Sequence, residues 1–198
     1  IDLLAHHPVD WVALGNAHAG RIMAGQWWRT ITALTLHADW PHLLSNIAIG
    51  GFFIHRLCRE LGSGLSWSLV VAAGSLGNLV NAWLHSPSHR AVGASTAVFG
   101  ALGLLAALNL IRYRHSLRRR WLLPVAAALA LLAMLGTEGE RTDVGAHLFG
   151  FAAGLLLGVA TALVTARRGL PRRLLNGLLA TATAAMVLGG WLAALTAG

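Results

Sequence analysis

Long apolar runs separated by short polar tracts divide most of this chain into segments of helical length. A membrane-spanning helix needs about 20 mostly apolar residues, and most of the runs approach that length. The tracts between them hold charged and turn-forming residues, as expected of short connecting loops. The pattern predicts six helical spans, over residues 42–57, 65–84, 95–111, 121–135, 144–166 and 174–195.

The segment before the first span, residues 1–41, is amphipathic rather than apolar. Its tryptophans Trp11, Trp27, Trp28 and Trp40 alternate with histidine, aspartate and arginine. Tryptophan is enriched where a membrane meets water. We therefore expect this segment to be a loop that lies in the headgroup region.

Composition supports an all-α polytopic membrane protein. Of the 198 residues, 56% are hydrophobic and only 11% are charged, whereas soluble domains average about 25% charged residues. The net charge of +8 would suggest a nucleic-acid partner in a soluble chain. Here most arginines lie between apolar runs, so no nucleic-acid partner is expected. The single cysteine, Cys58, excludes an internal disulfide and a multi-cysteine metal site.

The arginines also orient the predicted spans. Those in the loops after the first, third and fifth spans are Arg56, Arg59, Arg112, Arg114, Arg118, Arg119, Arg120, Arg167, Arg168, Arg172 and Arg173. Glu60 is the one acidic residue on that side. The positive-inside rule places these loops in the cytoplasm and the segment before His42 outside it. An outer loop that leads into an inward-going span is unusual at the start of a protein, so we expect a further span before Ile1.

Three groups of polar residues lie at the predicted outer ends of the spans. His42 and Asn46 share one face of the first span because they are four residues apart. Gly93 begins a turn that leads to Ser95 at the start of the third span, and His147 lies near the outer end of the fifth. Polar groups in lipid are costly and often functional. The topology predicts that the three groups meet just below the outer surface.

A stripe of small residues indicates how two of these spans approach each other. Gly150, Gly154 and Gly158 follow His147 on one helix face, which is the small-xxx-small pattern of close helix packing. Packing of this stripe against the third span would bring His147 beside Ser95. A serine with an adjacent imidazole is an activated nucleophile.

Each feature alone has an ordinary structural explanation. A serine at a helix start is usually a cap, and a histidine in a membrane helix can be a packed residue, a haem ligand or a proton relay. His42 and Asn46 could form a simple interhelical hydrogen bond, and the glycines could serve packing alone. Their joint occurrence at one predicted depth favours a catalytic site.

The chain resembles the rhomboid family of intramembrane serine proteases. The residues that carry the resemblance are Trp28-Arg29, His42 with Asn46, Gly93-Ala94-Ser95, and Ala146-His147 followed by Gly150 and Gly154. The resemblance implies that Ser95 is the nucleophile and His147 the general base. It also implies that His42, Asn46 and the backbone N–H of Ser95 form the oxyanion hole, and that Gly93 shapes the turn. In place of the second glycine of the family's GxSG motif stands Thr96, which could narrow the packing behind the nucleophile.

The resemblance also implies an organisation and a setting. Residues 1–41 are the extracytoplasmic interfacial loop, residues 42–172 a catalytic core of five spans, and residues 173–198 an extra C-terminal transmembrane helix; a further span normally precedes the loop. The expected substrates are transmembrane segments of other proteins in the bilayer, with no metal and no cofactor. The expected location is the bacterial inner membrane, with the site facing the extracytoplasmic side. Asp143 is expected to cap the fifth span rather than complete a triad.

Other functions fit the residues less well. A zinc protease needs the His-Glu-x-x-His motif, which His85 and His89 do not supply, and an aspartyl protease needs paired carboxylates within spans. A rhomboid-like pseudoprotease that binds client helices without cleaving them would lack the serine or the histidine. A haem protein or proton channel using His42 and His147 gives no role to Asn46.

Overall fold

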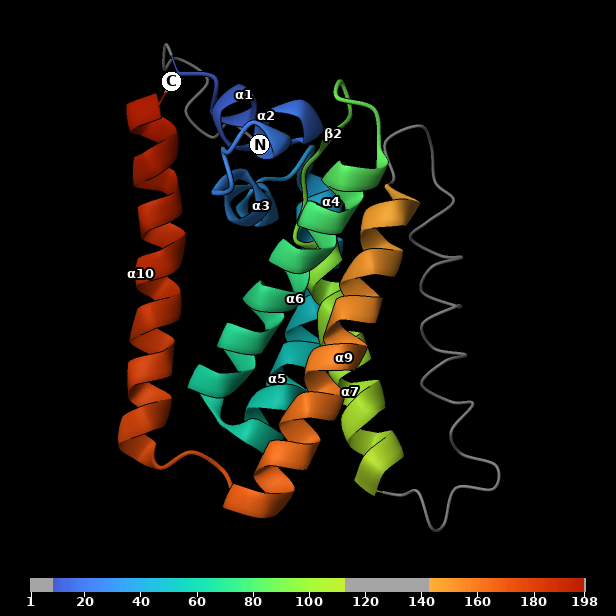
Figure 1. Cartoon of the computed structure of the whole chain (residues 1–198), viewed down its shortest axis with the longest axis vertical. Coiled ribbons are helices and arrows are strands. Elements are labelled where there is room, and N and C mark those ends of the chain that lie inside the picture. The colour runs from blue at the N-terminus through green and yellow to red at the C-terminus, as the bar shows by residue number, and fades with distance from the viewer. Residues whose placement is uncertain (1–8, 113–142, 198) are drawn as a thin grey trace.

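The computed structural model describes residues 9–112 and 143–197, which are mostly helical (Figure 1). Four helices in these residues are long and apolar enough to cross a membrane: α6 (Ser63–Leu84), α7 (Ser95–Arg112), α9 (Val144–Arg168) and α10 (Arg173–Ala197). They correspond to the second, third, fifth and sixth predicted spans. The predicted fourth span, residues 121–135, lies outside the described residues.

The predicted first span has a more complex structure than one long α-helix. Residues 40–61 form α4 (Trp40–Ser45), the π-helical turn η2 (Asn46–Gly50) and α5 (Gly51–Leu61). None of these pieces is among the four long apolar helices. The π turn interrupts the regular hydrogen-bond pattern, and α5 carries Arg56, Arg59 and Glu60. Six membrane spans are therefore not confirmed, and the sequence pattern did not predict the π turn. Such turns often occur at functional sites.

The interfacial loop folds into short helices around a buried arginine. The side chain of Arg29 is 2% exposed. Its Nη1 donates hydrogen bonds to the carbonyl oxygens of Ala13 and Asn16, each 3.0 Å away, and its Nε donates to Gln26 Oε1. These bonds connect α3 (Arg29–Thr32) to α1 (Trp11–Gly15) and to the turns at Asn16 and Gln26. The loop also contains α2 (Ala19–Met23) and the 3₁₀ turn η1 (Ala33–Thr35). Arg29 is thus a structural residue of the loop.

A short β-ladder connects this loop to the chain that precedes α7. Strand β1 (Ala17–His18) pairs antiparallel with β2 (Arg90–Ala91). Two residues after β2, the N–H of Gly93 donates a 3.0 Å hydrogen bond to the carbonyl oxygen of Ala33 in η1. The interfacial loop therefore fixes the turn that leads into Ser95.

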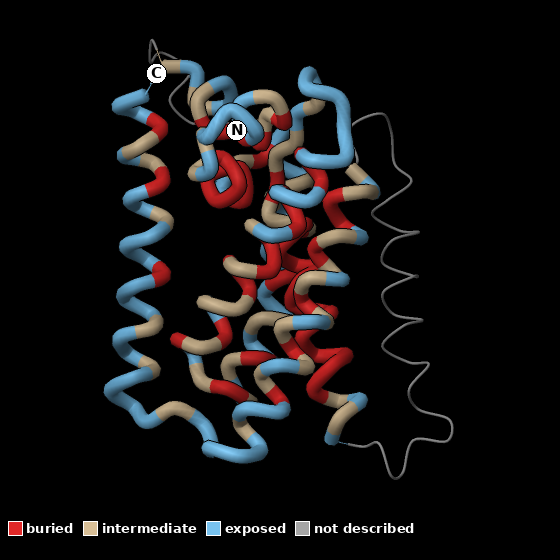
Figure 2. Tube along the Cα trace, in the orientation of Figure 1, coloured by how far each residue is buried: buried red, intermediate tan, exposed pale blue. Residues whose placement is uncertain are grey.

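Helix α7 is the centre of the bundle. Its residues from Thr96 to Leu108 are all buried, and it packs along α9 and against α6 and α5. Figure 2 shows the buried positions concentrated in these central helices, whereas α10 is largely exposed. The exposed side chains of α10 include Leu174, Leu188 and Leu192. An exposed apolar face of this kind is suited to contact with lipid.

The two ends of the bundle differ in chemistry. In Figure 1 the short interfacial helices gather at one end, and α5, α7 and α9 all finish at the other. At the latter end Arg112 Nη1 of α7 lies 3.3 Å from Glu60 Oε2 of α5, and α9 ends with Arg167 and Arg168. The described arginines of the predicted cytoplasmic loops thus gather at one end of the bundle, away from the interfacial helices.

Candidate active site

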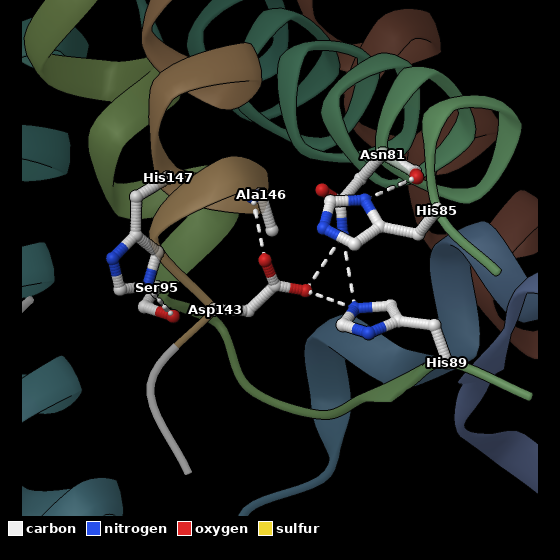
Figure 3. Close-up of polar contacts among 7 residues, drawn as sticks. All are labelled: Asn81, His85, His89, Ser95, Asp143, Ala146 and His147. Atoms are coloured by element: carbon white, nitrogen blue, oxygen red, sulfur yellow. Dashed lines mark hydrogen bonds and ion pairs between the residues drawn. The ribbon is translucent and has the colours of Figure 1, made fainter. Parts of the chain in front are cut away.

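The predicted serine and histidine are in direct contact. Ser95 is the first residue of α7, and His147 lies one turn into α9. Ser95 Oγ and His147 Nε2 are 2.7 Å apart, within hydrogen-bond distance (Figure 3). His147 is 4% exposed, whereas Ser95 is only partly buried. A hydroxyl hydrogen-bonded to a ring nitrogen is the arrangement needed for proton transfer from the serine.

The glycine stripe allows this contact by letting α9 lie close against α7. A Cβ added at Gly150 would overlap the carbonyl oxygen of Thr96, and one added at Gly154 would overlap that of Gly100. At Gly158 an added Cβ would be 2.7 Å from Ala107 Cβ. The predicted packing of the third span against the fifth is therefore confirmed.

An aromatic ring that the sequence reasoning missed packs against one face of the His147 imidazole. The ring of Phe99 stacks on that of His147, with the centroids 4.6 Å apart and the planes at 18°. Phe99 is itself 2% exposed. It lies four residues after Ser95, on the same face of α7, and this spacing was the signal that could have identified it.

The His42 imidazole lies against the glycine turn that precedes Ser95. Gly93 has φ +136°, a backbone conformation that favours glycine. A Cβ added there would lie 2.8 Å from His42 Nε2 and 3.4 Å from Ser95 Oγ. The imidazole therefore fills the space that the missing side chain leaves. The structure brings His42, Gly93 and Ser95 together as predicted.

Asn46 is buried at the beginning of the π turn. Its Nδ2 donates a 2.8 Å hydrogen bond to the carbonyl oxygen of His42, and its exposed fraction is 9%. The amide carries two N–H donors, so this bond occupies one of them. Asn46 thus lies beside His42 on one helix face, but the described structure shows no direct contact between its side chain and Ser95.

Thr96 fits where the family motif has a glycine because two other glycines make room for it. A Cβ added at Gly77 of α6 would be 2.7 Å from Thr96 Cγ2, and one at Gly150 of α9 would be 3.0 Å from it. The threonine methyl group thus packs between α6 and α9, and Thr96 is 4% exposed.

Asp143 caps α9 and points away from Ser95 and His147. Its Oδ1 accepts a 2.9 Å hydrogen bond from the Ala146 N–H, and its Oδ2 faces Asn81 and His89 (Figure 3). Burial raises the pKa of Asp143, but the hydrogen bonds from Ala146, His89 and Asn81 outweigh it and hold the pKa below its usual value. Among the described residues, nothing hydrogen-bonds to Nδ1 of His147. In the described part of the chain, no third side chain therefore hydrogen-bonds to the imidazole of His147 in the way that a triad requires.

His37, which the sequence reasoning also missed, lies beside His42. The two imidazoles meet edge to face, with their centroids 5.2 Å apart. Burial, together with the nearby His42, lowers the pKa of His37 to about 4. His37 is therefore neutral at physiological pH.

A cavity of about 1080 Å³ lies beside the site. Asn46, His37 and Ala94 line its wall near the site, and Trp67 and Val187 belong to its apolar remainder between α6 and α10. Neither Ser95 nor His147 lines it. This cavity is thus adjacent to Ser95 and His147, but it does not contain them.

Comparison with known proteins shows which family the chain belongs to. The model of the rhomboid domain matches residues 24–163, from the interfacial loop to α9. The chain belongs to the rhomboid family. All the candidate site residues fall inside the matched range, and with its apolar helices this rhomboid is an integral membrane protein.

Several rhomboid proteases are similar to the chain in sequence. It is 30% identical over 156 residues to the Bacillus subtilis (strain 168) protein named "Putative rhomboid protease YdcA", covering 78% of this chain and 77% of that one. It is 32% identical over 141 residues to Rhomboid-like protease 5 of Toxoplasma gondii, covering 69% of this chain and 16% of that one. With Rhomboid protease GluP of Bacillus subtilis it shares 29% identity over 177 residues, 87% of this chain and 33% of that one. The chain thus spans a third or less of the two latter relatives. No solved structure matches it.

Proposed function

We propose that this rhomboid is an intramembrane serine protease that cleaves transmembrane segments of other membrane proteins. The observation that carries the proposal is the 2.7 Å hydrogen bond between Ser95 Oγ and His147 Nε2. The names of its relatives, which are rhomboid proteases, support the same activity.

In the proposed reaction, Ser95 and His147 act as a dyad. Ser95 Oγ attacks the carbonyl carbon of the scissile peptide bond while His147 Nε2 accepts the hydroxyl proton. The protonated imidazole then gives this proton to the leaving amine, and an acyl ester on Ser95 remains. Water, deprotonated by His147, hydrolyses the ester and restores the serine. Phe99 keeps the imidazole ring in the plane that faces Ser95.

Three donors are proposed to stabilise the oxyanion formed in both steps. The N–H of Ser95 is at the start of α7, where backbone donors have no partner within the helix. Nε2 of His42 lies against the Gly93 turn, on the same side as Ser95 Oγ. The second N–H of the Asn46 amide is the third donor. Loss of one donor of this kind typically lowers the rate about 10²–10³-fold.

The proposed setting follows from the two ends of the bundle. The dyad belongs to the end that carries the interfacial loop, and the arginines of α5, α7 and α9 lie at the other end. We assign the arginine end to the cytoplasm of a bacterial inner membrane and the dyad to the extracytoplasmic side. A substrate helix must unwind locally there to expose its peptide bond.

The alternative function is that of a pseudoprotease that binds client helices. It gives no role to a serine that is in hydrogen-bond contact with an imidazole, and the close contact therefore favours catalysis. A catalytic serine is reactive and a purely structural one is not, so a measurement of reactivity distinguishes the two functions.

The test is labelling with a serine-reactive fluorophosphonate, combined with cleavage of a reporter transmembrane substrate. We expect the unmodified protein to be labelled and active. Ser95→Ala should lose both properties, and His147→Ala should lose nearly all of both. Because nucleophile and base act as one unit, the double variant should be no worse than either single variant. Ser88→Ala, on an exposed loop, is the matched control and should behave like the unmodified protein.

Labelling that persists in Ser95→Ala would exclude Ser95 as the nucleophile. A well-folded protein that is neither labelled nor able to cleave would support the pseudoprotease.

A further inference from the structure

A second polar cluster lies on the other side of Asp143 from the dyad. His85 and His89 come from the loop after α6, and Asp143 precedes α9, 54 residues beyond His89 (Figure 3). One ligating atom from each of these three residues lies within 4.8 Å of the others. His89 Nε2 and Asp143 Oδ2 are 2.6 Å apart, and the imidazoles of His85 and His89 stack with their centroids 4.3 Å apart.

The tautomer of His85 leaves one of its ring nitrogens free to bind a metal. Its Nδ1 lies 2.9 Å from the carbonyl oxygen of Asn81, and a carbonyl oxygen only accepts, so Nδ1 carries the hydrogen. This leaves Nε2 with a lone pair. Histidines that bind metals usually donate their other ring N–H to a carboxylate or a backbone carbonyl in this way.

The two carboxylate oxygens of Asp143 have separate contacts. Oδ1 caps α9 through the Ala146 N–H, and Oδ2 faces the cluster. An ion bound to Oδ2 would therefore leave the helix cap intact. The start of α9 can approach the cluster because residue 145 is glycine, where an added Cβ would be 3.0 Å from His85 Cε1.

Asn81 lies on the buried side of the cluster and contacts Asp143 and His89. It is 2% exposed, and its Nδ2 lies 2.6 Å from Asp143 Oδ2 and 3.3 Å from His89 Nε2. Its Oδ1 is buried, and no described residue hydrogen-bonds to it. Rotation of the amide by half a turn exchanges the two atoms and would direct this oxygen at the cluster as a further ligand. His85 is exposed, which leaves an entry path from water.

We propose that His85, His89 and Asp143 bind a divalent transition-metal ion such as Zn²⁺. Two imidazole nitrogens and a carboxylate oxygen are a common ligand set for zinc, with water or the Asn81 oxygen in the fourth position. The ion replaces the proton shared by His89 Nε2 and Asp143 Oδ2, and this proton passes to solvent. The bound ion connects the loop after α6 to the start of α9, the helix that carries His147. It therefore stabilises the packing of α6 against α9. The sequence did not indicate this site because the third ligand is distant along the chain.

The test is calorimetric titration of the detergent-purified chain with Zn²⁺. The protein is prepared without a polyhistidine tag, treated with a chelator and carries Ser95→Ala to prevent self-cleavage. A parallel titration with Co²⁺ reports the ligands through the visible absorption of a tetrahedral cobalt site. We expect one Zn²⁺ per chain and a higher melting temperature with the metal than without it.

Three variants and one control locate the ion. His85→Gln, His89→Gln and Asp143→Asn should each weaken Zn²⁺ binding by about 10- to 100-fold or more, since even residues that only support a ligand have effects of this size. Asp143→Asn keeps the helix cap, because asparagine caps as well as aspartate. His55→Gln, at an exposed histidine of α5, should bind Zn²⁺ as the parent does.

Two outcomes would overturn the proposal. If Zn²⁺ does not bind at micromolar concentration, the residues form a hydrogen-bonded cluster only. If Zn²⁺ binds but the three variants retain the affinity, the ion occupies other histidines. His85→Gln removes no contact with Asp143, so the melting temperature without metal shows whether the variant is folded. Both readouts are independent of proteolysis.

Discussion

The close packing of α9 on α7 gives a sharp prediction for Gly154→Val. A Cβ at residue 154 would overlap the carbonyl oxygen of Gly100 and lie 2.7 Å from its carbonyl carbon, whereas ordinary contacts begin near 3.4 Å. Because packed interiors have little free space, the helices must separate locally by about 0.5–1 Å or more. Valine adds two further methyl groups at the same place.

This separation should reach the dyad. His147 is seven residues from Gly154, about 10 Å along the helix axis, and its Nε2 is 2.7 Å from Ser95 Oγ. A displacement of about 1 Å in a catalytic arrangement lowers the rate about 10²-fold. Overpacking of this kind also destabilises a protein by about 1–3 kcal/mol. Gly154→Val should therefore lower both the melting temperature and the cleavage rate, although residue 154 is remote from the reacting atoms.

Two controls separate the steric effect from other effects of the substitution. Gly189→Val makes the same chemical change within α10, where an added Cβ meets nothing within 4 Å. Leu156→Val changes a residue of α9 that is 72% exposed and faces away from α7. Melting temperature and reporter cleavage are measured for all three variants in one detergent. If Gly154→Val behaves like the two controls in both measurements, α9 does not pack closely on α7 through this stripe.

Three further predictions concern the surroundings of the dyad. Asn46→Ala should lower kcat about 10²–10³-fold with little change in KM; a change confined to melting temperature would mean that its amide only supports the helix. Phe99→Leu should lower kcat while fluorophosphonate labelling of Ser95 slows in parallel, because the His147 ring loses its stacked partner; unchanged labelling kinetics would refute this role. Because burial holds the folded-state pKa of His37 at about 4, below the ordinary value of 6.5, the unfolded chain binds more protons between these values, and stability falls as pH drops from about 6.5 towards 4. The free energy of unfolding lost at pH 4 through this histidine is at most about 3 kcal/mol. If the melting temperature of His37→Gln falls with pH as much as that of the unmodified protein, His37 is not the source of the acid sensitivity.

The sequence by itself determined the long helices and the proximity of Ser95 and His147. Lipid requires every backbone group of a span to bond within its own helix, so apolar length alone predicts α6, α7, α9 and α10. Small-residue spacing is likewise a local property of one helix face, and it correctly predicted the packing of α9 against α7. The convergence of Ser95 and His147 followed from these two constraints together.

Tertiary structure alone decided the contacts between residues that no periodic pattern relates. The ring of Phe99 lies on His147, and the second oxygen of Asp143 faces His89 rather than the dyad. Such contacts depend on where two loops and a helix end meet in space, at separations of about fifty residues. Hydrophobic pattern and charge set the depth of each residue in the membrane, but they do not specify the individual side-chain contacts made at that depth.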